Sequence, residues 1–121
     1  MRIFQLDMLA GQCALVTGGT RGIGQAVCCM LAEAGADVAV IGRSSGEETT
    51  ARITALGRKA KFYPCDVSDF AAAEAVVKEV MADFGKIDIL VNNAGITKDM
   101  LLAQMREEDF DAVLDVNLKE G

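Results

Sequence analysis

Short apolar runs alternate along this chain with longer stretches in which apolar residues recur at every third or fourth position. The runs predict four β-strands, over 13–17, 38–41, 60–65 and 87–91. The longer stretches predict three helices: one over 22–34, one capped by Ser44 or Ser45 and ending at Gly57, and one capped by Ser68 or Asp69 and ending at Gly85. Because crossovers between parallel strands are right-handed, this order predicts an α/β fold, a doubly wound parallel sheet with strand order 3-2-1-4.

Two of the predicted helices carry an apolar stripe that should face the sheet. In the first helix the stripe consists of Ile23, Val27, Leu31 and Ala34. In the third it consists of Phe70, Ala73, Val77, Val80, Met81 and Phe84. A last segment, 107–120, has the pattern of the start of another helix. We therefore expect a partial domain whose C-terminal strands are missing.

Size, charge and cysteine content narrow the classes of protein. A chain of 121 residues is at most one domain, spanning 1–121, since single domains usually have about 100–200 residues. The net charge of −6 argues against nucleic-acid binding, which needs a basic surface. Gln5 and Asp7 interrupt any signal peptide, and no run reaches the roughly 20 apolar residues of a membrane span. Four cysteines without C-x-x-C spacing, and no histidine, predict a cytoplasmic protein with reduced thiols and no metal site.

A glycine-rich turn, T-G-G-T-R-G-I-G over 17–24, joins the first strand to the first helix. Gly18 allows a tight turn, Gly22 lets backbone approach a pyrophosphate, and Gly24 permits close packing of helix on strand. The helix N-terminus then offers N–H groups and partial positive charge to a diphosphate. This context is typical of Rossmann dinucleotide-binding folds, the alternative being a turn without a ligand. The residues expected to contact the dinucleotide are Gly18, Gly19, Thr20, Arg21, Gly22, Ile23 and Gly24.

The end of the second strand indicates which dinucleotide is bound. Where NAD-binding Rossmann folds place an Asp or Glu for the adenosine ribose, this chain has Arg43 and Ser44. A carboxylate would repel a 2′-phosphate, whereas a guanidinium binds it through paired, charge-assisted hydrogen bonds. Arg21 lies on the same side and would complete a two-arginine clamp. The pattern favours NADP(H) as cofactor, unless both arginines are solvated surface charges.

Two motifs together, T-G-x-x-x-G-x-G at 17–24 and N-N-A-G at 92–95, resemble the short-chain dehydrogenase/reductase family. The resemblance implies that Asp66 and the backbone of Val67 contact the adenine, although Asp66 alone could equally cap a helix. It also implies that Asn93, Ala94 and Gly95 lie beside the cofactor, and that Asn117 is the Asn of the family's catalytic tetrad. A packing role for Asn117 is the alternative.

The resemblance covers about the first half of a family domain. The family's proton donor is the Tyr of a Tyr-x-x-x-Lys pair, whereas the one tyrosine here, Tyr63, is followed four positions later by Val67. Residues 92–118 resemble the subgroup of 3-oxoacyl-[acyl-carrier-protein] reductases. This implies NADPH-dependent reduction of a 3-oxoacyl thioester, free or linked to acyl-carrier protein, in a family that usually forms homotetramers. The alternatives are an inactive NADP(H)-binding fragment, which we expect to self-associate through its fourth strand, or a reductase of a sugar or other carbonyl compound.

Overall fold

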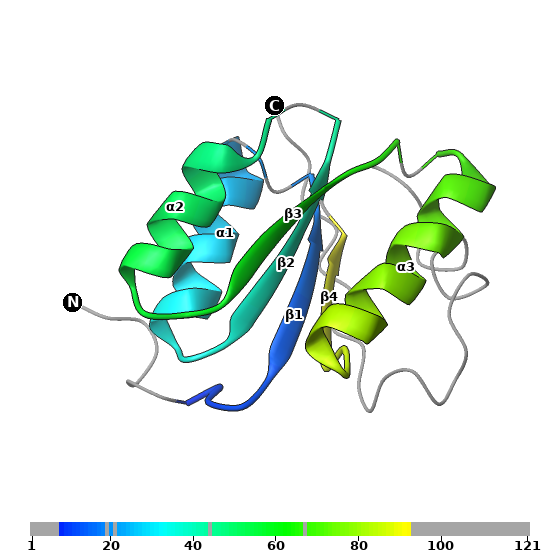
Figure 1. Cartoon of the computed structure of the whole chain (residues 1–121). Helices are drawn as coiled ribbons and strands as arrows, with labels where there is room; N and C mark the ends of the chain where they lie inside the picture. The colour runs from blue at the N-terminus through cyan, green and yellow to red at the C-terminus, as the bar shows by residue number, and fades with distance from the viewer. Residues whose placement is uncertain (1–7, 19, 21, 44, 67, 93–121) are drawn as a thin grey trace.

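Four parallel strands and three helices follow one another in strict alternation (Figure 1). The computed structural model describes residues 8–18, 20, 22–43, 45–66 and 68–92, apart from the side chain of Phe70. The elements are β1 (Cys13–Thr17), α1 (Gly22–Glu33), β2 (Asp37–Gly42), α2 (Glu47–Ala55), β3 (Ala60–Pro64), α3 (Phe70–Phe84) and β4 (Ile89–Asn92). The sheet order is β3-β2-β1-β4, with every pair parallel, which confirms the predicted fold class. The helix predicted over 107–120 lies outside the described residues.

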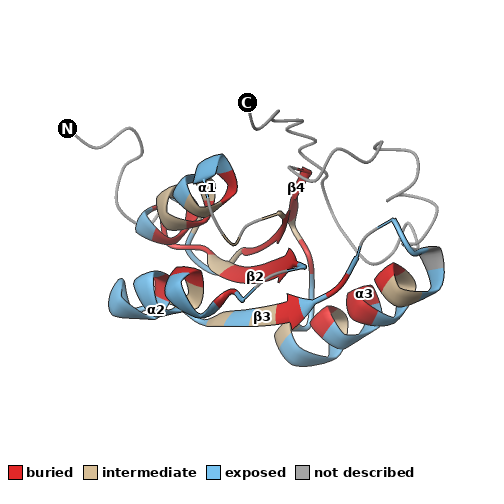
Figure 2. Ribbon diagram, turned by 90° about the horizontal axis from the view of Figure 1, so that it is seen from above, coloured by how far each residue is buried: buried red, intermediate tan, exposed pale blue. Residues whose placement is uncertain are grey.

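Helices cover both faces of the sheet, α1 and α2 on one side and α3 on the other (Figure 1). Neighbouring residues of β1 point to opposite faces: Leu15 packs in the core beneath α3, whereas Ala14 and Val16 pack in the core beneath α1 and α2. Buried residues accordingly run along the strands and the inner sides of the helices (Figure 2). This double coverage explains why β1, β2 and β4 are almost continuously apolar.

The buried face of α1 differs from the predicted stripe at several positions. Ile23 is 42% exposed, so its assignment to the buried stripe was wrong. The residues that α1 buries are Gly24, Cys28, Leu31 and Ala32. Gly24 is buried although it has no side chain to contribute to an apolar stripe, and its neighbour Ile23 lies outside the buried face. The helix ends as predicted before Gly35, which has the left-handed φ of 109°.

The start of α2 was also predicted wrongly. The N-cap is Gly46, without a side-chain cap, rather than Ser45; Ser44 lies outside the described residues. A Cβ built on Gly46 would collide with the ring of Phe62, a residue of β3. Packing against β3 thus fixes where the helix begins and overrides the capping preference of serine.

At the amino ends of the strands, β4 begins two residues later than its apolar run. Asp88, just before β4, binds β1 partly through its side chain. Its Oδ2 accepts a hydrogen bond from the Cys13 N–H at 2.8 Å, while its own N–H donates to the Cys13 carbonyl at 2.9 Å. Lys86 lies 3.2 Å from the same carboxylate. The regular ladder therefore starts only at Ile89.

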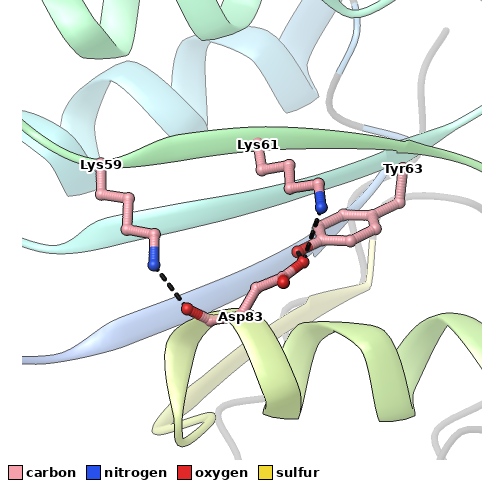
Figure 3. Close-up of polar contacts among 4 residues, drawn as sticks. All are labelled: Lys59, Lys61, Tyr63 and Asp83. Carbon is pink, nitrogen blue, oxygen red and sulfur yellow. Dashed lines mark hydrogen bonds and ion pairs between the residues drawn. The ribbon is translucent and has the colours of Figure 1, made fainter.

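A polar cluster fastens β3 to α3 at the outer edge of the sheet (Figure 3). The buried Tyr63 donates its hydroxyl hydrogen bond to Asp83 at 2.6 Å, and Lys61 lies 2.7 Å from the same carboxylate oxygen. Lys59 donates to the Asp83 backbone carbonyl at 2.5 Å. The helix itself has the predicted caps, with the Asp69 side chain accepting from the Ala72 N–H. Tyr63 is therefore a structural residue here, as its sequence context predicted.

Membrane spans, metal sites and disulfide bonds can be examined in the part of the chain that the structure describes. There, no helix has both the length and the apolar character needed to cross a bilayer. Within the same residues, no group of three or more His, Cys, Asp or Glu side chains could hold a metal ion. All four cysteines are free thiols; Cys28 is buried and Cys29 is half-buried.

Candidate functional site

The carboxyl ends of the strands lie at one edge of the sheet, and the strand register aligns them there. In the strand register Thr17 pairs with Ile41 on one side and with Asn92 on the other. Beyond the ladder, the Gly18 N–H donates to the Ile41 carbonyl at 2.8 Å, and the Cys65 N–H donates to the Gly42 carbonyl at 3.0 Å. Ligands of open α/β sheets bind at this edge. Each sequence motif therefore emerges at the same end of the fold.

The turn between β1 and α1 has the backbone geometry that its glycines predicted. Gly18 and Gly22 have φ angles of 69° and 62°, in the left-handed region that glycine adopts without strain. Gly24 is buried, whereas Ile23 faces solvent. Gly19 and Arg21 lie outside the described residues.

The beginning of α1 is electrostatically suited to an anion. A helix leaves its first N–H groups without partners inside the helix, and its dipole adds partial positive charge there. The first turn of α1 contains no acidic residue that would compete for this charge. A diphosphate placed against the turn at Gly22 would thus meet backbone donors and a favourable field.

Arg43 follows directly after β2 and is exposed. Asp37, the acidic residue of this strand, pairs with Cys13 at the other end of the ladder. The residue directly after β2, where a carboxylate would bind an adenosine ribose, therefore carries a guanidinium. The neighbouring Ser44 lies outside the described residues.

Asp66 lies on the exposed connection between β3 and α3. Its Oδ1 accepts hydrogen bonds from the Ser68 hydroxyl at 2.6 Å and from the Ser68 N–H at 3.0 Å. These bonds, with a smaller contribution from the positive charge of Arg43, hold the pKa of Asp66 below its ordinary value. Asp69, not Asp66, caps α3, so the helix-capping alternative for Asp66 is wrong. Its ionised carboxylate faces the same edge as Arg43, while Val67 is outside the described residues.

A buried hydrogen bond at this edge was not foreseen from the sequence. The Thr17 hydroxyl donates to the Asn92 side-chain oxygen at 3.2 Å, and both residues are fully buried. Thr17 begins the first motif and Asn92 begins the second, so the bond connects the two. The signal was present in the sequence, because two polar residues end apolar strands that pair in parallel. Asn93, Ala94, Gly95 and Asn117 lie outside the described residues, and their predicted roles remain predictions.

Curated proteins of two different activities resemble this chain closely. It is 49% identical over 113 residues to a 2-dehydro-3-deoxy-D-gluconate 5-dehydrogenase of Pseudoalteromonas atlantica, a match that covers 91% of this chain. It is 46% identical over 109 residues to a 3-oxoacyl-[acyl-carrier-protein] reductase of Staphylococcus aureus, covering 88% of this chain. The chain spans 44% of the length of each of these relatives.

The same relationship holds in three dimensions. A 3-oxoacyl-[acyl-carrier protein] reductase from Brucella melitensis, solved in complex with NAD, superposes with a TM-score of 0.67 at 44% identity. That match covers 70% of this chain and 34% of the other. The family model for short chain dehydrogenases matches residues 12–120, nearly the whole sequence. The chain therefore belongs to the short-chain dehydrogenase family, whose members are oxidoreductases with a Rossmann-type sheet.

Proposed function

We propose that the carboxyl edge of the sheet binds an adenine dinucleotide through the turn after β1. The observation that carries this proposal is the turn itself: Gly18 and Gly22 in left-handed conformations, followed at once by the N-terminus of α1. The diphosphate would rest on backbone donors of the turn and of α1. Thr20, Ile23 and the residues predicted beside them complete the proposed cradle.

The proposed cofactor is NADP(H) rather than NAD(H). Support comes from the exposed Arg43 at the end of β2, where a carboxylate would exclude a 2′-phosphate. The opposing consideration is that the related Brucella melitensis reductase was solved with NAD. The choice therefore rests on the guanidinium of Arg43, with Arg21 as its proposed second arm, and can be tested at that side chain.

Calorimetric titration of the chain with NADP⁺ and NAD⁺ tests both the dinucleotide site and the preference for NADP(H). We expect tighter binding of NADP⁺, and we expect Arg43→Ala to weaken NADP⁺ binding by about tenfold or more while changing NAD⁺ binding little, the scale of a charge-assisted hydrogen bond. Arg52→Ala is the matched control, because Arg52 is an exposed arginine paired with Glu48 on α2. Equal affinity for the two nucleotides would remove the case for NADP(H), and binding of neither would remove the case for the site.

For the whole protein, we propose NADPH-dependent reduction of a 3-oxoacyl thioester, free or carried by acyl-carrier protein, in the cytoplasm. The resemblance of residues 92–118 and the Staphylococcus aureus relative support this substrate. A sugar-acid substrate is the second candidate, because the Pseudoalteromonas atlantica relative is a 2-dehydro-3-deoxy-D-gluconate 5-dehydrogenase. Assays of acetoacetyl thioester with NADPH, which would be consumed, and of 2-dehydro-3-deoxy-D-gluconate with NADP⁺, which would be reduced, distinguish the two by the absorbance of NADPH.

These 121 residues alone are proposed to bind the cofactor without turning it over. Their single tyrosine, Tyr63, is buried in β3 and donates its hydroxyl hydrogen bond to Asp83, so it is not available as a proton donor at the strand ends. Asn117 is proposed to serve the proton relay only together with a Tyr-x-x-x-Lys pair. Steady, substrate-dependent NADPH consumption by this chain would contradict the proposal.

A further inference from the structure

Gly42, the last residue of β2, is one of the points where the turn after β1 contacts β2. A Cβ built on Gly42 would lie 2.7 Å from Cγ2 of Thr20, closer than carbon atoms pack. The next nearest atoms are Oγ1 and Cβ of the same threonine, at 3.4 and 3.6 Å. Gly42 is not among the glycines with positive φ. Space, not backbone conformation, is therefore what excludes a side chain at this position.

Neither partner in this contact can move aside easily. The Gly42 carbonyl accepts the Cys65 N–H at 3.0 Å, and Gly42 is in register with Pro64 of β3. Thr20 is β-branched, so rotation of its side chain is restricted. A methyl group at position 42 would consequently displace the turn that carries Thr20, because β2 is held in the sheet.

The contact also connects two parts of the proposed cofactor site. Thr20 belongs to the turn proposed for the diphosphate, and Gly42 immediately precedes Arg43, proposed for the 2′-phosphate. In a dinucleotide the diphosphate and the 2′-phosphate are joined through one ribose, so their separation varies little. A site that holds both must keep its turn and its guanidinium at a matching distance, and misplacement of about 1 Å can be costly.

We infer that the Thr20–Gly42 contact is a specificity-determining contact, which sets the position of the diphosphate turn relative to Arg43. This inference rests on the proposed function. If the distance between the diphosphate turn and Arg43 changes, the 2′-phosphate of NADP(H) no longer reaches Arg43. NAD(H) has no 2′-phosphate, so its binding is affected less. Selectivity for the phosphorylated dinucleotide thus depends on Gly42 and Thr20 as well as on the arginine.

Adding a methyl group on one side of the contact and removing one from the other side tests this inference. Gly42→Ala adds a methyl that collides with Thr20, and Thr20→Ser removes the Cγ2 with which it would collide. Of the three atoms nearest to the new methyl, the double variant keeps Oγ1 and Cβ, at 3.4 and 3.6 Å, which are ordinary contacts. Ser45→Ala is a control in the same connection, since Ser45 is exposed.

The measured quantity is the selectivity ratio, the Kd of NAD⁺ divided by the Kd of NADP⁺, obtained by calorimetry on the full chain. We expect each single variant to lower the ratio by about fivefold or more, and the double variant to return to within about twofold of the wild type, as for residues in direct contact. A role confined to stability would leave the ratio unchanged. If Gly42→Ala alone does not fold, the double variant should still exceed Thr20→Ser in selectivity.

The outcomes separate this inference from the proposed function. Unchanged ratios in the single variants, or a double variant as unselective as Thr20→Ser, overturn the inference while NADP⁺ binding by the wild type stands. A wild type that binds neither nucleotide overturns the proposed function, and the inference with it.

Discussion

Replacing Thr17 with valine removes one hydroxyl from the buried junction between β1 and β4. That hydroxyl donates to the Asn92 side-chain oxygen at 3.2 Å and lies 3.5 Å from the Val91 carbonyl. Thr17 and Asn92 are both 0% exposed. Valine has nearly the shape of threonine, so the change removes a hydrogen-bond donor without opening a cavity.

The expected loss follows from the two distances and from the burial. Removing one partner of a buried hydrogen bond costs about 1–3 kcal/mol. Both contacts are long for O–H···O bonds, and the added methyl offsets part of the loss by about 0.8 kcal/mol. We therefore expect the free energy of unfolding to fall by about 1 kcal/mol for Thr17→Val.

Urea unfolding followed by far-ultraviolet circular dichroism measures this effect. With a slope of about 1–2 kcal/mol per molar urea for a small domain, the midpoint should fall by roughly 0.5–1 M. Thr54→Val is the matched control, because Thr54 is exposed on α2 and surface substitutions usually stay within about 0.5 kcal/mol. A Thr17→Val midpoint equal to the wild type, or above it, would refute the assignment of this hydrogen bond.

Three further predictions concern the helix cap, the thiols and alkaline pH. Asp69→Ala removes the side-chain cap of α3 and should cost about 1 kcal/mol, measured as a lower urea midpoint. Burial raises the pKa of Cys13 and Cys28 to about 12, so mass spectrometry after iodoacetamide treatment should find the half-buried Cys29 modified before either. Burial and, after it, the hydrogen bond to the carboxylate of Asp83 raise the pKa of Tyr63 above its ordinary value. Above about pH 10 the unfolded state therefore loses a proton that the folded state keeps, and the free energy of unfolding should fall. The fall should be less steep in Tyr63→Phe, which lacks the hydroxyl.

The sequence predicted the elements that periodicity controls and missed features that depend on contacts across the fold. Strand order and the caps of α3 followed from local patterns. The start of α2 did not, because Gly46 is selected by the ring of Phe62, which belongs to another strand. Ile23 was placed in the core because a periodic pattern counts apolar side chains and passes over Gly24, the buried residue beside it.

The candidate site shows the same division. Its location and its glycine turn were predictable, since motifs that end parallel strands must meet at one edge. The contact between Thr20 and Gly42 was not predictable, because it joins a loop to the end of a strand that is distant in the sequence, and its one trace in the sequence is a glycine. Similarly, excluding Asp66 as the cap of α3 required the observation that Asp69 occupies the cap.

The claim that the carboxyl edge of the sheet receives an adenine dinucleotide can be tested residue by residue. Titration of the ¹⁵N-labelled chain with NADP⁺, followed by amide chemical shifts, maps the contact surface directly. We predict shifts concentrated at Gly18, Gly42 and Asp66, with none at the opposite edge, at Lys86 and Asp88. Shifts concentrated at that opposite edge, or no shifts at saturating nucleotide, would contradict the account.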